Sequence, residues 1–390
     1  MCKRTSLQWG VRMAKRRETE HINAEKQKII AQAAELLVAW YRQEGRELPW
    51  RKDREAYRIW ISEIMLQQTR IEAVRPYYAR FMEELPDMNS LACVPEERLL
   101  KLWEGLGYYS RARNLQKCAR QVMEEYGGRL PSDYDKLVKL PGIGPYTAGA
   151  IASIAYGQAV PAVDGNVLRV LARLLADRED IGQPAAKKKA WKLLAAAMPQ
   201  DCPGEFNEGI MELGETVCLP GGRPLCEKCP LEALCEAHRQ GIEEELPVKA
   251  AAGPRRREER TVLLLWREDG TGRRTAIRRR PAKGLLAGMY EFPSLDGFVG
   301  EEGVRKYLDG LGLVPLRIEE AGRARHVFSH VEWEMEGYLV QLAPAGSGEN
   351  MPEGDEADKV KAADFLYVDS EQMKESYALP SAFRAYMKWV

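Results

Sequence analysis

The 390-residue sequence lacks a net charge, a long apolar run and an internal repeat. Its 58 basic and 58 acidic residues balance, which excludes a polycation that coats nucleic acid, so any DNA contact must be local. No run approaches the roughly 18 apolar residues of a membrane-spanning helix, and residues 1–30 carry no apolar signal-peptide core. We therefore expect a soluble protein in a reducing compartment, without membrane association or a disulfide framework.

The composition changes along the chain and predicts four parts. Residues 1–22 carry clustered basic side chains without an apolar pattern, so we expect a flexible basic tail. In residues 23–238 apolar side chains recur at helical spacing, which predicts an all-α region. Residues 239–260 hold proline, glycine and alternating charge blocks, typical of a linker. Residues 261–390 alternate strand-like runs such as TVLLLW and HVFSHVEWEMEGYLVQL with helix-like runs such as EGVRKYLDGLG and SAFRAYMKWV, which predicts an α+β domain.

Four of the eight cysteines lie within eighteen residues of a Pro- and Gly-rich stretch, with the spacing C-x7-C-x2-C-x5-C. They are Cys218, Cys226, Cys229 and Cys235. Thiols this dense usually hold a metal, and disulfides are disfavoured in a reducing compartment. The spacing alone supports structural zinc and an iron–sulfur cluster about equally.

The string LPGIGPYTA places Gly142 and Gly144 between two helical segments. This arrangement suits a tight hairpin whose second helix exposes backbone N–H groups, which bind phosphate without a basic side chain. An ordinary helix–helix turn is the alternative interpretation. Two carboxylates near this string are ambiguous in the same way. An exposed helix glutamate is the simpler interpretation of Glu63. Asp164 could be a helix N-cap, a role that Asn166 could also fill.

Five motifs in order resemble the adenine DNA glycosylases of the MutY family: YRIWISEIMLQQTR, WEGLGYYSRARNL, LPGIGPYTAGAI, VPAVDGNVLRVLAR and the cysteine cluster. The resemblance covers residues 23–238 and extends to the final domain. It implies a multidomain protein in which an all-α helix-hairpin-helix glycosylase with a [4Fe–4S] cluster module precedes an α+β Nudix-like domain. The hairpin-bearing part would span about 51–154, and the cluster part would combine 23–50 with 155–238.

The resemblance also implies a reaction, the removal of adenine paired with 8-oxoguanine or guanine in base excision repair. Glu63 matches the family's general acid, which protonates adenine at N7. Its large apolar neighbours would help such an acid to keep its proton. Asp164 matches the carboxylate that stabilises the cationic sugar. Tyr146 stands where related enzymes that also cut the strand carry a Schiff-base lysine. We therefore expect a monofunctional enzyme, with the Tyr146 phenol assisting the sugar.

Further residues match family positions that contact the flipped adenine or the DNA. Chemistry on a base requires its extrusion from the duplex, and wedge side chains fill the gap. Core packing is the competing interpretation, above all for Leu106. The matches are Trp50, Arg51 and Glu208 in the adenine pocket, Gln68, Thr69, Leu106, Tyr108, Gly142 and Gly144 at the DNA, and Phe328, Ser329 and His330 in a loop that reads 8-oxoguanine.

By the same resemblance the four cysteines hold a [4Fe–4S] cluster, and the gap between Cys218 and Cys226 is one residue longer than the family's usual spacing. We expect the cluster to shape a loop with Arg223 and Lys228 that meets the DNA backbone. In the final domain the acidic magnesium helix of Nudix enzymes is replaced by GVRKYLDGLG, so we expect no pyrophosphohydrolysis. A histidine metal site at HVFSH has no third ligand nearby.

Two other hypotheses remain, an endonuclease III-like glycosylase/lyase for oxidised pyrimidines and a noncatalytic DNA-binding module. Tyr146 and the FSH string argue against the first hypothesis, and the retention of both carboxylates argues against the second. The expected partner is double-stranded DNA with adenine opposite 8-oxoguanine or guanine. We expect a monomer, cytoplasmic and nucleoid-associated if the source is bacterial.

Overall fold

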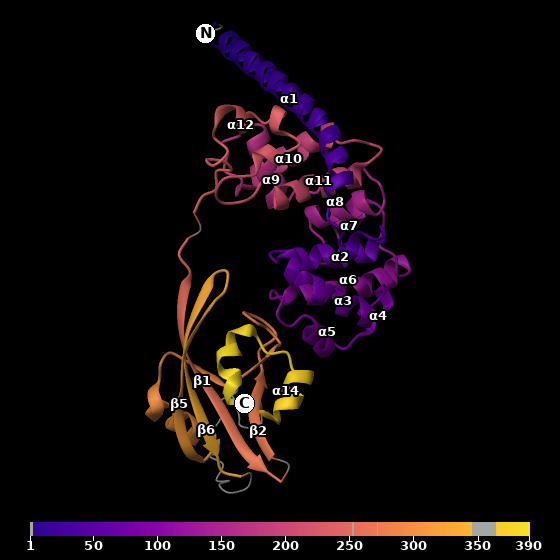
Figure 1. Ribbon diagram of the computed structural model, residues 1–390. Helices are drawn as coiled ribbons and strands as arrows, with labels where there is room; N and C mark the ends of the chain where they lie inside the picture. Colours follow the sequence, from indigo (N-terminus) through magenta and orange to yellow (C-terminus); the bar gives the residue numbers. More distant parts are fainter. Residues whose placement is uncertain (1–2, 252, 271, 345–363) are drawn as a thin grey trace. The chain divides into compact units, whose positions relative to one another are not determined.

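The computed structural model describes residues 3–251, 253–270, 272–344 and 364–390, with side chains from residue 24 onward. The chain divides into two compact units (Figure 1). Unit 1 comprises Met1–Ala92 and Asn114–Ala251, and unit 2 comprises Cys93–Arg113 and Ala252–Val390. Within the described ranges, no helix has both the length and the apolar character needed to cross a membrane.

Unit 1 is built from helices, as the apolar periodicity predicts. The first helix begins at Lys3, inside the segment predicted as a tail, and residues 1–2 lie outside the described residues. The elements are α1 (Lys3–Glu44), η1 (Pro49–Arg51), α2 (Ala56–Leu66), α3 (Ile71–Glu84), α4 (Met88–Cys93), α6 (Ser110–Tyr126), α7 (Tyr134–Leu137), α8 (Pro145–Ile154), α9 (Gly165–Leu174), α10 (Pro184–Ala197), α11 (Pro203–Thr216), η2 (Cys226–Lys228), η3 (Glu232–Leu234) and α12 (Glu236–Gln240). The ends of α4 and α6 belong to unit 2.

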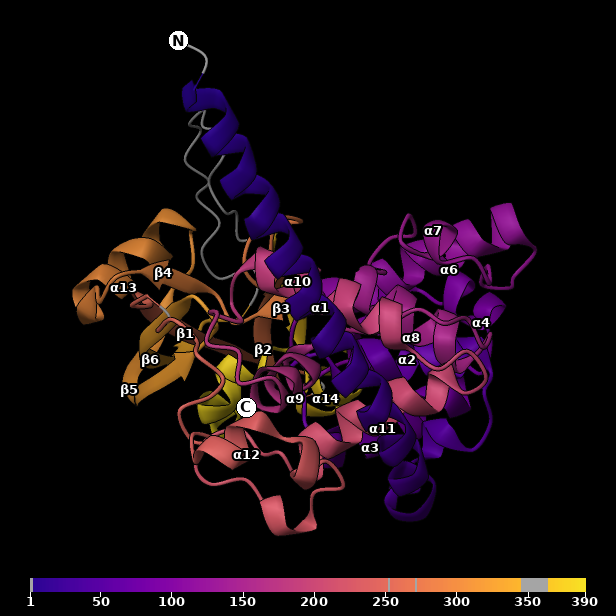
Figure 2. The same cartoon turned by 90° about the horizontal axis from the view of Figure 1, so that it is seen from above.

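The second half of α1 shows why this region folds as helices. Its buried residues Ile30, Ala33, Ala34, Leu37 and Val38 recur every three or four positions, so they form one apolar stripe. This stripe enters the core cluster that also contains apolar residues of α9, α10 and α11. Figure 2 shows α1 running beside α10 and α11. The second half of α1 is therefore held by helices that begin more than 120 residues after α1 ends.

The predicted hairpin joins α7 and α8. Gly142 has a φ of +75°, and a side chain there would bring a Cβ within 2.7 Å of Asn114 Cβ, so both the backbone and the space require glycine. Gly144 is the N-cap of α8 with a φ of −87° and open space around it. Beyond its first two residues α8 is buried, and it packs against α2 and α11.

Unit 2 contains a mixed sheet with the strand order β3-β2-β1-β6-β5, in which β4 also pairs with β1 and β7 with β2. The β1–β6 pair is parallel and the others are antiparallel. The elements are α5 (Glu96–Leu102), β1 (Arg256–Asp269), β2 (Gly272–Arg279), β3 (Tyr290–Glu291), β4 (Ser294–Asp296), α13 (Gly300–Gly310), β5 (Pro315–Val327), β6 (Val331–Leu342), β7 (Leu366–Val368), α14 (Ser370–Ser376) and η5 (Ser381–Trp389).

Alternation along β1 places helices on both faces of this sheet. Val262 and Leu264 share a core with α14 and η5, whereas Leu263 and Leu265 share a second core with α13. Figure 2 shows α13 and α14 on opposite sides of the strands. Gly337 in β6 admits Tyr386, because a Cβ there would lie 2.3 Å from the tyrosine ring.

Three details of the C-terminal region differ from the sequence-based expectation. The first strand begins at Arg256, inside the predicted linker. The HVFSH string is not one strand, since β5 ends at Val327 and β6 begins at Val331. The final SAFRAYMKWV segment is a 3-10 helix and not a regular α-helix.

Candidate active site

Three helices bring the predicted catalytic residues together inside unit 1. Glu63 lies on α2, Tyr146 in the first turn of α8, and Asp164 immediately before α9. The Tyr146 hydroxyl donates to Glu63 Oε2 at 2.6 Å and also contacts Met211 Sδ of α11 at 3.2 Å. The phenol therefore ties the hairpin helix directly to the candidate acid.

The environment of Glu63 is suited to a general acid. Its side chain is buried, with 7% of the residue exposed. Burial raises the pKa of Glu63 to about 7, with the carboxylates of Asp164 and Glu208 acting in the same direction and the Tyr146 hydrogen bond opposing them. Glu63 can thus hold a proton near neutral pH and release it, which general acid catalysis requires.

Asp164 is half-buried and occupies a polar environment. It is the N-cap of α9, where its Oδ1 accepts from the Val167 N–H at 2.8 Å and its Oδ2 accepts from Asn166 Nδ2 at 3.0 Å. Burial raises the pKa of Asp164, whereas these hydrogen bonds and the charge of Arg169 oppose the shift. The N-cap role considered from the sequence is therefore present, and it leaves Asp164 with donors that favour its ionised form.

Asp164 is also connected to the cysteine-rich loop. Asn166 donates to Asp164 and accepts from Arg169 Nη2 at 2.8 Å. Arg169 in turn donates through Nε to the carbonyl oxygen of Cys218 at 2.8 Å. Arg169 is buried, with 7% of its surface exposed. A continuous chain of hydrogen bonds therefore joins the candidate sugar-facing carboxylate to a candidate metal ligand.

The three residues predicted for the adenine pocket lie on η1 and α11. Trp50 is buried and packs edge-on against Tyr78, with ring centroids 5.3 Å apart. Arg51 Nε lies 3.4 Å from Glu208 Oε1, so a cationic donor and an anionic acceptor stand side by side. Burial raises the pKa of Glu208, and the Arg51 charge opposes this. Such a pair can address both the acceptors and the donors of a purine base edge.

The hairpin presents backbone donors. The first intrahelical hydrogen bond of α8 runs from the Ala148 N–H to the Gly144 carbonyl at 2.9 Å. The N–H groups of Tyr146 and Thr147 precede that bond in the first helical turn, where backbone N–H groups and the helix dipole favour an anion.

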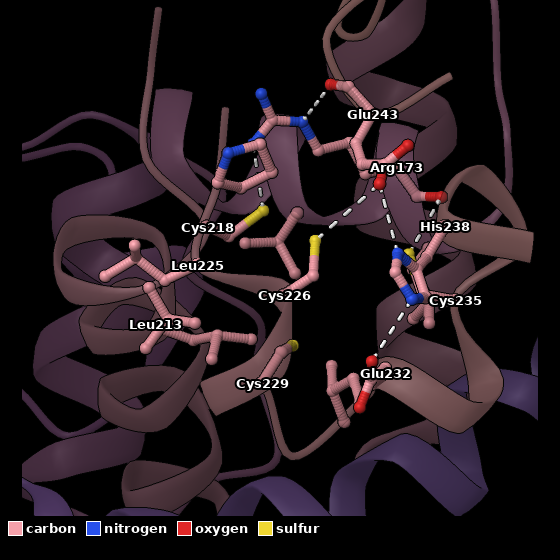
Figure 3. A pocket seen from close by; sticks show the side chains of 15 residues that line it. Arg173, Leu213, Cys218, Leu225, Cys226, Cys229, Glu232, Cys235, His238 and Glu243 are labelled. Carbon is pink, nitrogen blue, oxygen red and sulfur yellow. Dashed lines mark hydrogen bonds and ion pairs between the residues drawn. The ribbon is translucent and has the colours of Figure 1, made fainter. Parts of the chain in front are cut away.

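The four clustered cysteines line one pocket of unit 1, as Figure 3 shows. Arg173, buried in α9, donates through Nη1 to Cys218 Sγ at 3.3 Å. Its Nε donates to the carbonyls of Glu243 and Leu246 at 2.8 and 2.9 Å, which fixes the chain that follows the cysteines. Four sulfur donors around one space fit a metal centre held by thiolates. His238 and Glu243 also line the pocket, and atoms of both lie within 4.8 Å of Cys226 Sγ.

Two of the predicted DNA-contacting residues have a strained backbone. Gln68 and Tyr108 have φ values of +58° and +47°, and both side chains are exposed. Left-handed conformations of residues other than glycine cluster at functional sites. Thr69 is half-buried, and Leu106 is buried with 6% of its surface exposed. Leu106 is therefore a buried side chain in this structure, and its predicted contact with DNA stays a prediction.

The predicted lesion-reading residues form the turn between β5 and β6 in unit 2. The Phe328 N–H donates to the Val331 carbonyl at 2.8 Å, and the Phe328 ring lies 5.0 Å from that of Trp333. Ser329 and His330 are exposed at the tip. The hydroxyl groups of Ser329 and Tyr108, which are 221 residues apart, are hydrogen-bonded. Unit 2 thus brings two predicted DNA-contacting residues together.

Comparison with known proteins places this site in a family. Residues 61–196 match the model of the HhH-GPD superfamily base excision DNA repair protein, and residues 261–389 match a NUDIX domain. The adenine DNA glycosylase of Mus musculus is 39% identical over 368 residues, which cover 80% of this chain and 71% of that protein. The chain belongs to the adenine DNA glycosylase family.

Other relatives agree with this assignment. The adenine DNA glycosylase of Homo sapiens is 38% identical over 363 residues, which cover 78% of this chain and 66% of that protein. The solved structure of a thermostable thymine-DNA glycosylase aligns with a TM-score of 0.50 and 28% identity, covering 56% of this chain and 98% of the other. These matches confirm the predicted fold class. They also confirm the prediction that the protein is an adenine DNA glycosylase of base excision repair. The domain bounds and the roles of single residues stay predictions.

Sequence reasoning missed three residues around the predicted adenine pocket, namely Tyr41, Arg46 and Glu212. Glu212, which is only 1% exposed, accepts hydrogen bonds from Arg51 and Arg46. The Tyr41 ring centroid lies 5.4 Å from the Arg51 guanidinium. One signal was available. The carboxylates at positions 205, 208, 212 and 215 follow helical spacing, which predicts a single acidic face.

Proposed function

We propose that this protein removes adenine paired with 8-oxoguanine or guanine in duplex DNA by hydrolysis of the N-glycosidic bond, without cutting the strand. The observation that carries the proposal is a pair of carboxyl groups in different environments. Glu63 is buried and has a pKa of about 7, whereas Asp164 accepts a hydrogen bond from the Val167 N–H. Two carboxyl groups in different environments are what acid-assisted loss of a base requires.

In the proposed reaction Glu63 donates its proton to N7 of the extruded adenine. The base then leaves as a neutral group, and positive charge develops on the sugar. Asp164, supported by Asn166 and the Val167 N–H, stabilises that charge as a carboxylate. Water then adds to the anomeric carbon of the sugar and loses a proton, which returns Glu63 to its acid form. Tyr146, bonded to Glu63, orients the acid and faces the same reacting centre.

The DNA would be held on both sides of the lesion. The first turn of α8 supplies N–H groups for a backbone phosphate. The exposed Tyr108 would occupy the gap that the flipped base leaves. Gln68 and Thr69 would contact the DNA from their own loop after α2. The Phe328–His330 turn would read 8-oxoguanine, and the hydrogen bond between Ser329 and Tyr108 supports a shared position at the lesion.

The four pocket-lining cysteines would hold a [4Fe–4S] cluster. The donor set fits, since four thiolates are the usual ligands of such a cluster. When bound, the cluster would supply a crosslink between the loop after α11 and the segment before α12. Arg173 would orient Cys218, and Arg169 would connect the loop to Asp164.

The proposal is tested with excess enzyme on a duplex that carries one adenine opposite 8-oxoguanine, analysed with and without alkali. We expect strand breaks only after alkali treatment. Glu63→Gln should abolish the product while the duplex still binds, and Glu72→Gln on the exposed face of α3 serves as the matched control. Breaks without alkali would favour the lyase hypothesis, and an active Glu63→Gln variant would disprove the acid role.

The cluster is tested separately on protein purified without air. We expect iron in the metal analysis and a broad absorbance near about 400 nm, both of which Cys226→Ser should lose. Zinc without iron would contradict the assignment.

A further inference from the structure

One face of α11 carries four carboxylates, which we call the acidic face: Glu205, Glu208, Glu212 and Glu215. Each lies near an arginine from α1 or from the segment after it. The pairs are Arg42–Glu205 at 2.6 Å, Arg54–Glu205 at 3.7 Å, Arg51–Glu208 at 3.4 Å, Arg51–Glu212 at 2.9 Å, Arg46–Glu215 at 2.6 Å, and Arg46–Glu212. The acidic face and these arginines therefore form a continuous network of ion pairs. The network is exposed at its two ends, at Glu205 and Glu215, and most buried at Glu212.

Glu212 is the buried centre of this face. Its side chain is 1% exposed, compared with 11% for Glu208, 20% for Glu205 and 35% for Glu215. Although burial acts to raise it, hydrogen bonds from Arg46 and the charge of Arg51 hold the pKa of Glu212 below its usual value. Glu212 is thus a buried anion whose partners are fixed in place.

The bonds of Glu212 determine where the Arg51 guanidinium lies. Glu212 Oε2 accepts from Arg51 Nη2 at 2.9 Å, and the Arg46 carbonyl accepts from Arg51 Nη1 at 3.1 Å. Glu212 also binds Arg46 through the backbone N–H at 3.3 Å and Nη2 at 3.1 Å, so it fixes that carbonyl as well. Both outer nitrogens of Arg51 therefore depend on one carboxylate.

The guanidinium is planar and rigid, so fixing Nη1 and Nη2 also fixes Nε, which faces Glu208 at 3.4 Å. Its five N–H groups exceed the three used in these contacts, which leaves donors for the acceptor nitrogens of a base. Glu208 presents an acceptor beside them, matching the exocyclic amine of adenine. The pair is complementary to adenine only while Arg51 keeps this orientation.

We propose that Glu212 is a positioning residue for adenine recognition: it holds Arg51 against Glu208 and so sets the preference for a base with an exocyclic amine, without touching the base. This inference rests on the proposed function. It differs from a purely stabilising role, in which a buried ion pair holds the fold and affects every substrate equally.

The two roles are separated by comparing adenine with purine, which lacks the exocyclic amine, each opposite 8-oxoguanine. Single-turnover rates are measured for the wild type and for Glu212→Gln, an isosteric change that removes the charge. A displaced base or clamp costs on the order of a hundredfold in rate, so we expect that loss on adenine and a much smaller loss on purine. The ratio of the rate on adenine to the rate on purine should fall at least about tenfold, which is the discrimination expected from one polar contact.

Glu205→Gln is the matched control, because Glu205 lies on the same face but its ion pairs among the described residues are with Arg42 and Arg54 and not with Arg51. Its ratio should equal that of the wild type. Glu212→Asp keeps the charge and should retain more of the ratio than Glu212→Gln, and it replaces the latter if the amide variant does not fold. Glu208→Gln combined with Glu212→Gln should lose less than the product of the single effects, since both changes disable one clamp.

The possible failures are distinguishable. If the wild type does not remove adenine, the proposed function falls, and the inference falls with it. If the wild type is active but Glu212→Gln slows both substrates equally, with an unchanged ratio, the positioning role is wrong and Glu212 only stabilises the fold.

Discussion

The hydrogen bond from Tyr146 to Glu63 offers a direct test of how this site tunes its acid. At 2.6 Å the phenol donates to the carboxylate and so favours the ionised form of Glu63. Tyr146→Phe removes that donor and leaves Asp164, Glu208 and Arg51, the other charged groups that act on Glu63, in place. We therefore expect the pKa of Glu63 to rise in the variant.

The size of the shift follows from the strength of the bond. A hydrogen bond to a charged group contributes about 1.5–3 kcal/mol, and one pKa unit corresponds to about 1.4 kcal/mol. The loss should therefore raise the pKa by about one to two units from the wild-type value of about 7. An acid must be protonated to act, so the rate falls as pH rises through its pKa. Relative to its own plateau, the variant should keep roughly five to ten times more activity than the wild type at pH 8.

The measurement is the single-turnover rate of adenine removal from about pH 5 to about pH 9. Each profile is scaled to its plateau, so that any loss of rate from the missing phenol does not obscure the position of the alkaline limb. Tyr156→Phe is the matched control. Tyr156 lies just after α8, and its hydroxyl donates a hydrogen bond to the Leu130 carbonyl, so its loss should leave the wild-type profile unchanged. An alkaline limb that stays in place or moves to lower pH in Tyr146→Phe would refute the reasoning.

Two further predictions concern stability. The raised pKa of Glu63 means that the native state binds this proton more tightly than the unfolded state, so stability falls as pH rises from about 4.5 through 7. Glu63→Gln cannot ionise and so avoids this loss of stability. The variant should raise the free energy of unfolding, measured in urea, by about 3 kcal/mol at pH 8 and by less than about 1 kcal/mol at pH 5. An equal gain at both pH values would contradict the pKa shift. In the hairpin, Gly142→Ala should cost about 1–3 kcal/mol and weaken duplex binding, because its φ is +75° and Asn114 is too close. Gly144→Ala should change stability by less than about 0.5 kcal/mol, since its φ is negative and its surroundings are open; similar losses in both variants would show that φ and space do not decide these positions.

The sequence predicts much of the fold because local periodicity encodes it. The spacing of Ile30, Leu37 and their neighbours indicates a helix with one buried face, and the structure has that face in the core. The two glycines of the hairpin and the clustered cysteines are also local signals. By contrast, β5 is largely exposed and carries several charged residues, so no apolar alternation identifies it.

The candidate site is only partly readable from the sequence for a related reason. Glu63 and Asp164 are identified through motifs, but the burial that raises the pKa of Glu63 depends on α8 and α11. The partners of Arg51 cannot be found locally, since Glu212 is 161 residues away. Asp164 also shows that one residue can fill two predicted roles, because capping α9 does not remove it from the site.

The distance along the chain between Arg51 and Glu212 has a consequence during synthesis. At about 5–20 residues per second a ribosome needs on the order of ten to thirty seconds to translate from one residue to the other. For most of that interval the arginines around η1 have no α11 carboxylates, and the apolar stripe of α1 has neither α10 nor α11 to cover it. The nascent chain therefore passes through a period in which its first helix is a target for chaperones, and the length of that period depends on translation speed.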